Sequence, residues 1–96
     1  MYQGTTPTFT LTIPDTVDLT TASNVYVTFS QGNKLLTKTG DSIAVSAHSV
    51  DVYMTQEETV SFVPGIVRIQ MNWTFAGGQR ACSDIRTISV NSNLVT

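Results

Sequence analysis

Within residues 66–75 the side chains alternate between apolar and polar from residue 67 onward, and this pattern constrains the fold more than any other feature of the chain. Val67, Ile69 and Met71 share one face with Trp73, and polar or charged residues stand between them. Residues two apart lie on the same face of a β-strand, so the segment is expected to be a strand with one face buried. The chain is therefore expected to be built from strands.

Alternating or β-branched segments recur along the whole sequence and give about seven strands in total. The other expected strands cover residues 8–13, 24–31, 34–39, 42–46, 50–54 and 80–90. Turn residues separate them, including the two glycines within residues 76–79. Within residues 80–90 the alternation is less regular near Ser83, where a β-bulge would shift its phase.

Short antiparallel strands at this spacing predict an all-β fold, an immunoglobulin-like β-sandwich rather than a closed barrel. Residues 1–96 form a single domain, because a chain of 96 residues has room for one modest core. We expect a short N-terminal arm over residues 1–7 and a C-terminal tail over residues 91–96. The expected core between the two sheets consists of Val27, Phe29, Val67, Ile69, Met71 and Trp73.

One segment departs from the strand pattern and predicts a short helical connector over residues 55–62. Thr55 and Glu58 have the spacing of a capping box, in which each side chain bonds the backbone of the other residue. Glu57 and Glu58 also stand where the helix dipole favours negative charge. Pro64 and Gly65 then end the helix.

The low content of charged residues excludes several kinds of partner. Asp, Glu, Lys and Arg make up 12% of the chain, and the net charge is −2. Five scattered cationic residues cannot form the basic face that nucleic acid requires. The apolar runs are too short to cross a membrane, and residues 1–8 lack the features of a signal peptide. We therefore expect synthesis in the cytoplasm, with no nucleic-acid or membrane partner.

The sequence offers little for catalysis, metals or cofactors. His48 is the only histidine and is expected to be an exposed turn residue, although Asp51 and Ser83 could in principle complete a triad with it. Cys82 is the only cysteine, so no internal disulfide is possible, and we expect it to be a small buried hydrophobe. A calcium site at Asp15 and Asp18 has only weak support. We predict no enzyme activity, no metal and no cofactor.

Three aromatic residues raise one ligand hypothesis, a carbohydrate-binding module that recognises glycans on a cell surface. Trp73 with Tyr26 and Tyr53 could form a platform on which a sugar stacks. Trp73, however, shares its expected face with Val67, Ile69 and Met71, which favours a place in the core. The module therefore stands as the alternative to the function considered next.

Four stretches of the sequence resemble a known group of proteins. They are G-T-T-P-T-F at residues 4–9, L-L-T-K at 35–38, T-Q-E-E-T at 55–59, and I-Q at 69–70 with S-D-I at 83–85. The chain resembles small accessory proteins of tailed bacteriophages and prophages of Gram-positive bacteria. It is also similar to the N-terminal immunoglobulin-like domain of the siphophage upper baseplate protein. The resemblance implies a virion structural protein of the tail, baseplate or capsid, made in the host cytoplasm.

The resemblance also implies partners, namely other virion proteins and copies of the chain itself in a homo-oligomer. A polar surface carrying 16 threonines and 9 serines but few charges costs little to desolvate in such packing. The uncharged residues 42–46 would also leave a strand edge open to pairing. We expect the arm to lie against a neighbouring subunit. The predicted interface residues are Met1, Tyr2, Gln3, Gly4, Thr5, Thr6 and Pro7.

Overall fold

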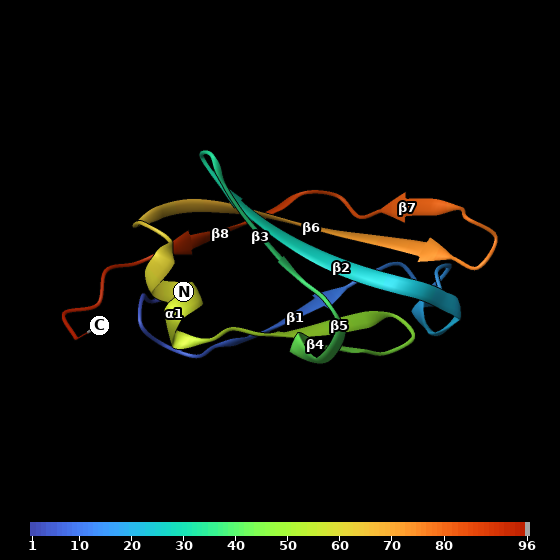
Figure 1. Ribbon diagram of the computed structural model, residues 1–96, viewed down its shortest axis with the longest axis horizontal. Helices are drawn as coiled ribbons and strands as arrows, with labels where there is room; N and C mark the ends of the chain where they lie inside the picture. Colours follow the sequence, from blue (N-terminus) through green and yellow to red (C-terminus); the bar gives the residue numbers. More distant parts are fainter. Residues whose placement is uncertain (96) are drawn as a thin grey trace.

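The computed structural model describes residues 1–95, which form eight strands, one short α-helix and two 3-10 turns. The strands are β1 (Thr8–Thr12), β2 (Ala22–Gln31), β3 (Lys34–Lys38), β4 (Ile43–Val45), β5 (Ser49–Tyr53), β6 (Gly65–Phe75), β7 (Arg80–Cys82) and β8 (Arg86–Val90). The helix α1 spans Gln56–Ser61, and the 3-10 turns span Leu19–Thr21 and Gly40–Ser42. Figure 1 shows the strands in two layers, with α1 and both termini at one end.

The strands form two antiparallel sheets. The small sheet has the order β1-β5-β4, and the large sheet has the order β3-β2-β6 with both β7 and β8 beyond β6. The predicted all-β fold with one helical connector is confirmed, and the immunoglobulin-like type of sandwich stays a prediction. The strand number exceeds the expected seven because residues 80–90 form two strands instead of one.

A β-bulge separates β7 from β8 and explains this split. Cys82 pairs with Asn72, and Arg86 pairs with Ile69. The three residues 83–85 therefore lie opposite only two residues of β6, 70 and 71. Ser83 lies in the bulge. Its N–H donates to the Met71 carbonyl on β6 at 2.9 Å, and its Oγ accepts from the Met71 N–H at 3.0 Å. The extra residue shifts the phase of the alternation where the sequence pattern becomes irregular.

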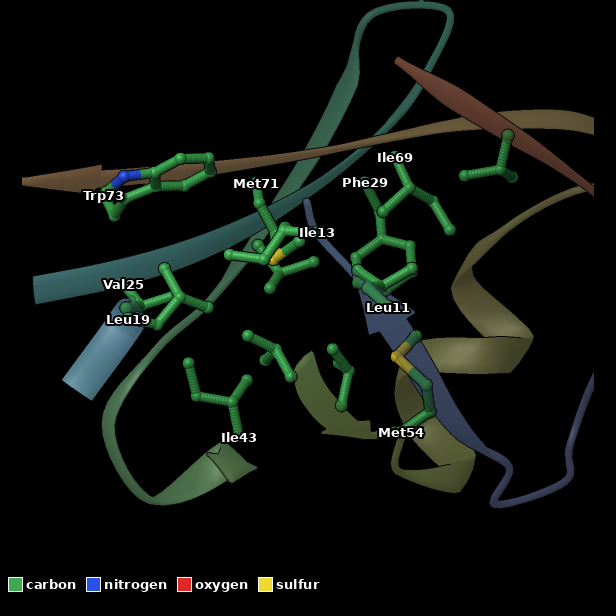
Figure 2. Packing of buried hydrophobic residues seen from close by; sticks show 14 of the residues in the cluster. Leu11, Ile13, Leu19, Val25, Phe29, Ile43, Met54, Ile69, Met71 and Trp73 are labelled. Atoms are coloured by element: carbon green, nitrogen blue, oxygen red, sulfur yellow. The ribbon is translucent and has the colours of Figure 1, made fainter. Parts of the chain in front are cut away.

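The core lies between the two sheets and consists of the inward side chains of both (Figure 2). In the large sheet β2 pairs with β6, placing Val27 opposite Met71 and Phe29 opposite Ile69. All six residues expected in the core are buried, and Trp73 is only 4% exposed. The small sheet covers them mainly with Leu11, Ile43, Val50 and Val52, together with Ile13 directly after β1.

The helix α1 begins with the predicted capping box, which is confirmed. Thr55 Oγ1 accepts a hydrogen bond from the Glu58 N–H at 3.2 Å, and the Thr55 N–H donates to Glu58 Oε1 at 2.8 Å. After the helix, the Phe62 ring is fully buried and packs against Phe29 with ring centroids 6.3 Å apart. The helix and Phe62 therefore close one end of the sandwich.

The expectation that Cys82 is a small buried hydrophobe is wrong, because its side chain is exposed. Cys82 pairs with Asn72, which lies between the buried Met71 and Trp73 and therefore faces away from the core. The strand β7 also lies at an edge of the sheet, where its outer face has no covering layer.

Candidate functional site

The N-terminal arm, residues 1–7, lies against its own chain beside the end of β8. The Asn91 N–H donates to the Met1 carbonyl at 2.7 Å, and the Gln3 N–H donates to the Asn91 carbonyl at 3.0 Å. The amino group of Met1 donates to the Ser89 carbonyl at 2.7 Å. Tyr2 and Asn91 form an isolated parallel bridge. The start of the arm thus extends the chain's own pairing beyond the large sheet.

Further hydrogen bonds hold the rest of the arm to the closed end of the sandwich. The buried Thr59 hydroxyl donates to the Thr5 carbonyl at 2.8 Å, and Gln3 Nε2 donates to the Phe62 carbonyl at 2.6 Å. The Met54 N–H donates to the Pro7 carbonyl at 3.1 Å. Because these backbone groups have partners inside the chain, a neighbouring subunit would contact the arm mainly through its side chains.

Most of the exposed large apolar side chains belong to segments at the end of the molecule that holds the arm. Ten large hydrophobic side chains are exposed among the described residues, and six of them belong to the arm, α1, the loop that follows α1, the start of β6 or the C-terminal tail. These segments lie together at one end of the molecule (Figure 1). We call the six the terminal patch, which consists of Tyr2, Val60, Val63, Ile66, Leu94 and Val95.

The residues of the terminal patch lie in segments without charged side chains. Residues 2–7, 59–67 and 87–95 contain no Asp, Glu, Lys or Arg. Covering these segments with another protein would therefore desolvate few charged groups. Exposed apolar side chains concentrated at one end of a small domain are typical of a site that another molecule covers.

A buried ion pair connects α1 with the large sheet. Lys38 Nζ on β3 donates to Glu58 Oε1 at 2.5 Å, and Lys38 is only 5% exposed. Burial acts to raise the pKa of Glu58, but the hydrogen bonds from Lys38 and Thr55 outweigh it, so this pKa is lowered. Nearby, Lys34 Nζ lies 5.4 Å from the centroid of the Phe62 ring. The end of the molecule that carries the terminal patch is thus held by charge as well as by apolar packing.

The residues with triad chemistry lie on different elements. His48 is exposed as expected, in the turn between β4 and β5, with Nδ1 2.6 Å from the Val17 carbonyl oxygen. Asp51 lies on the small sheet and accepts from Thr10 Oγ1 at 2.7 Å. Ser83 belongs to the bulge of the large sheet. Each of the three residues therefore has its own hydrogen-bond partner, and Ser83 and Asp51 lie on different sheets.

Asp18 has a structural role at a 3-10 turn. Its carboxylate accepts from the Thr20 hydroxyl and, at 3.0 Å, from the Thr20 N–H, and these bonds lower the pKa of Asp18. Within residues 1–95, no three His, Cys, Asp or Glu side chains are grouped so that they could hold a metal ion. The weak calcium hypothesis for Asp15 and Asp18 gains no support from this geometry.

The three aromatic residues of the proposed sugar platform are not brought together. Trp73 lies in the core, and Tyr26 lies between the inward Val25 and Val27, so it faces outward on the large sheet. Tyr53 is 46% exposed on the small sheet. The half-buried Tyr26 and the exposed Tyr53 therefore lie on different sheets of the sandwich.

Sequence reasoning identified Tyr2 but missed the other five residues of the terminal patch. A signal for them existed in the two long uncharged segments 59–67 and 87–95, each of which contains apolar residues outside the expected core. These segments are far from the arm in the sequence, and only the folded chain places them beside it. Their common location could not be deduced from alternation alone.

Comparison with known proteins identifies no relative: no family model, curated protein or solved structure matches the chain. Across residues 1–95, no helix has the length and apolar character that a membrane span requires.

Proposed function

We propose that the chain is a structural subunit of a bacteriophage virion, which packs through its terminal patch against copies of itself and other virion proteins. The observation that carries the proposal is the presence of six of the ten exposed large apolar side chains at one end of the molecule, in segments without charged side chains. The geometry supports a protein contact surface. The assignment to a virion comes from the resemblance of the four sequence stretches to phage accessory proteins.

The dimensions of the molecule favour a repeated contact over a single strong one. The short axes measure 22 and 20 Å, so an end-on contact has a cross-section smaller than the roughly 800 Å² per partner of a standard interface. One such contact is expected to be weak, and several contacts in a closed assembly would stabilise each other. A subunit in a symmetric particle has this arrangement. The role needs no catalysis, metal or cofactor.

The proposal is tested by placing charges within the terminal patch. The variant Val63→Asp/Leu94→Asp carries two carboxylates at exposed apolar positions, and Leu35→Asp makes the same kind of change at an exposed residue of β3. Light scattering after size exclusion measures the mass at increasing protein concentration. We expect the mass of the wild type and of Leu35→Asp to rise above 10.4 kDa, while the patch variant stays monomeric.

Two results would contradict the proposal. The first is a wild-type protein that stays monomeric at every concentration up to the millimolar range, where weak contacts of this size would be occupied. The second is a patch variant that associates as strongly as the wild type. No structural observation favours the carbohydrate-binding alternative, because Trp73 lies in the core.

A further inference from the structure

A recess of about 420 Å³ opens on one flank of the sandwich, away from the terminal patch. Its walls include Ile13, Pro14 and Val17, from the end of β1 and the loop that follows, and Trp73 and Ala81 from β6 and β7. Trp73 and Ala81 are directly opposite each other in the pairing of β6 with β7. The recess therefore lies where the edges of the two sheets are open to solvent.

One wall of the recess contains a buried donor without an acceptor. Trp73 is 4% exposed, and its Nε1 has no hydrogen-bond partner among the described residues. Buried polar groups in folded proteins nearly always have a partner, and leaving one unpaired destabilises the native state. A ligand that fills the recess and accepts this N–H would therefore remove an existing penalty.

The charges at the rim indicate what kind of ligand fits. Asp84 and Arg86 both line the recess and carry opposite charges, so neither a cation nor an anion has a net advantage there. Arg86 also donates to the Thr12 carbonyl, which connects the large sheet to the end of β1. The remaining walls are mostly apolar.

The geometry points to a binding site for a small uncharged molecule with an apolar body and one hydrogen-bond acceptor, such as a carbonyl or ether oxygen. The apolar body packs against Val17, Ala81 and the indole ring. The oxygen accepts the Nε1 proton after a shift of the surrounding side chains uncovers this atom, which is buried in the unliganded protein. The volume lies within the range of about 300–1,000 Å³ that small-molecule sites occupy. The site shares no residue with the terminal patch and is independent of the proposed function.

A pair of ring compounds tests the inference on the wild-type protein. Trp73 is the only tryptophan, so the ¹H–¹⁵N spectrum contains one indole N–H signal. Cyclohexanone carries a carbonyl oxygen, and methylenecyclohexane has a CH₂ group in its place. We expect cyclohexanone to shift the indole proton signal downfield in a saturable manner. Methylenecyclohexane has no acceptor and should not produce the downfield shift.

Two substitutions that fill the recess provide the second arm of the test. Ala81→Leu and Val17→Phe enlarge side chains on opposite walls, and each is expected to abolish the saturable shift. Ala44→Leu is the matched control, because Ala44 is exposed on β4 and does not line the recess. Dispersed backbone signals show whether each variant is folded. If a variant does not fold, the comparison of the two compounds on the wild-type protein still tests the inference.

Three results would overturn the inference. One is an indole signal that cyclohexanone does not move, as expected if a tightly held water molecule accepts the proton. The second is an equal downfield shift with both compounds. The third is a folded filling variant that retains the full saturable shift. Each of these results would leave the assembly test at the terminal patch unaffected.

Discussion

Replacing Glu58 with glutamine tests the buried ion pair separately from the helix cap, because glutamine can also complete a capping box. The substitution leaves the Lys38 ammonium, whose side chain is 6% exposed, without the carboxylate that lies 2.5 Å away. Breaking a buried pair by removing one partner costs about 3–5 kcal/mol. The Glu58 side chain is 20% exposed, so we expect a loss near the lower limit, about 3 kcal/mol.

The reverse substitution separates the contributions of the two charges. Lys38→Met keeps most of the apolar stem and leaves Glu58 partly exposed with its hydrogen bond from the Thr55 N–H. We expect a smaller loss, about 2 kcal/mol, because solvent can still stabilise this carboxylate. The double variant Lys38→Met/Glu58→Gln has no unpaired buried charge and should lose less than the two single losses added together.

Urea unfolding followed by tryptophan fluorescence measures each free energy of unfolding. Glu57→Gln is the matched control, since Glu57 is an exposed neighbour of Glu58 and should change the stability by no more than about 0.5 kcal/mol. A loss below about 1 kcal/mol for Glu58→Gln would refute the reasoning. So would strict additivity of the two single variants, because the side chains would then not interact in solution.

Three further predictions concern the pH dependence, the core and the cap. Because the pKa of Glu58 is lowered on folding, its contribution is complete above its unfolded pKa of about 4.3 and is lost as the pH falls through the lower folded pKa. Urea unfolding between pH 6 and pH 2.5 should therefore show a steeper loss for the wild type than for Glu58→Gln. Trp73→Ala should lower the free energy of unfolding by about 3–5 kcal/mol, measured by circular dichroism, and a loss below about 1 kcal/mol would contradict its place in the core. Thr55→Ala should cost about 1 kcal/mol through loss of the N-cap oxygen, whereas Thr87→Ala, at an exposed strand residue outside the cap, should cost less.

The strands could be predicted because their signal is local. Alternation within β2 and β6 identifies the inward side chains, and the two strands then pair with Val27 opposite Met71. The capping box was also predictable, since Thr55 and Glu58 are three residues apart and require no distant partner. Features determined by neighbouring residues can be deduced from the sequence wherever their pattern is strong.

The features that the sequence did not predict depend on contacts between distant residues. The position of Cys82 follows from its pairing with Asn72 across the edge of the sheet. The burial of Lys38 is stabilised by Glu58, which lies 20 residues further along the chain. Composition and alternation contain no information on either partner.

The candidate site was predictable only in part for the same reason. The arm was expected to take part in an interface, which stays a prediction, and its exposed Tyr2 is one of the residues of the terminal patch. The arm is nevertheless held by Asn91 and Thr59, which are far from it in sequence. The other patch residues come from two segments, residues 60–66 and 94–95, which lie beside the arm only in the folded chain.

Amide hydrogen exchange at low and high protein concentration tests most directly whether the terminal patch packs against other copies of the chain. We expect the amides of residues 60–63, 65–66 and 92–95 to exchange more slowly at high concentration, while those of β3 and β4 do not change. Exchange that is independent of concentration throughout the chain would contradict the proposed packing. Slower exchange confined to β3 around Leu35, the exposed apolar residue used as the control position, would assign the contact to the outer face of the large sheet instead of the terminal patch.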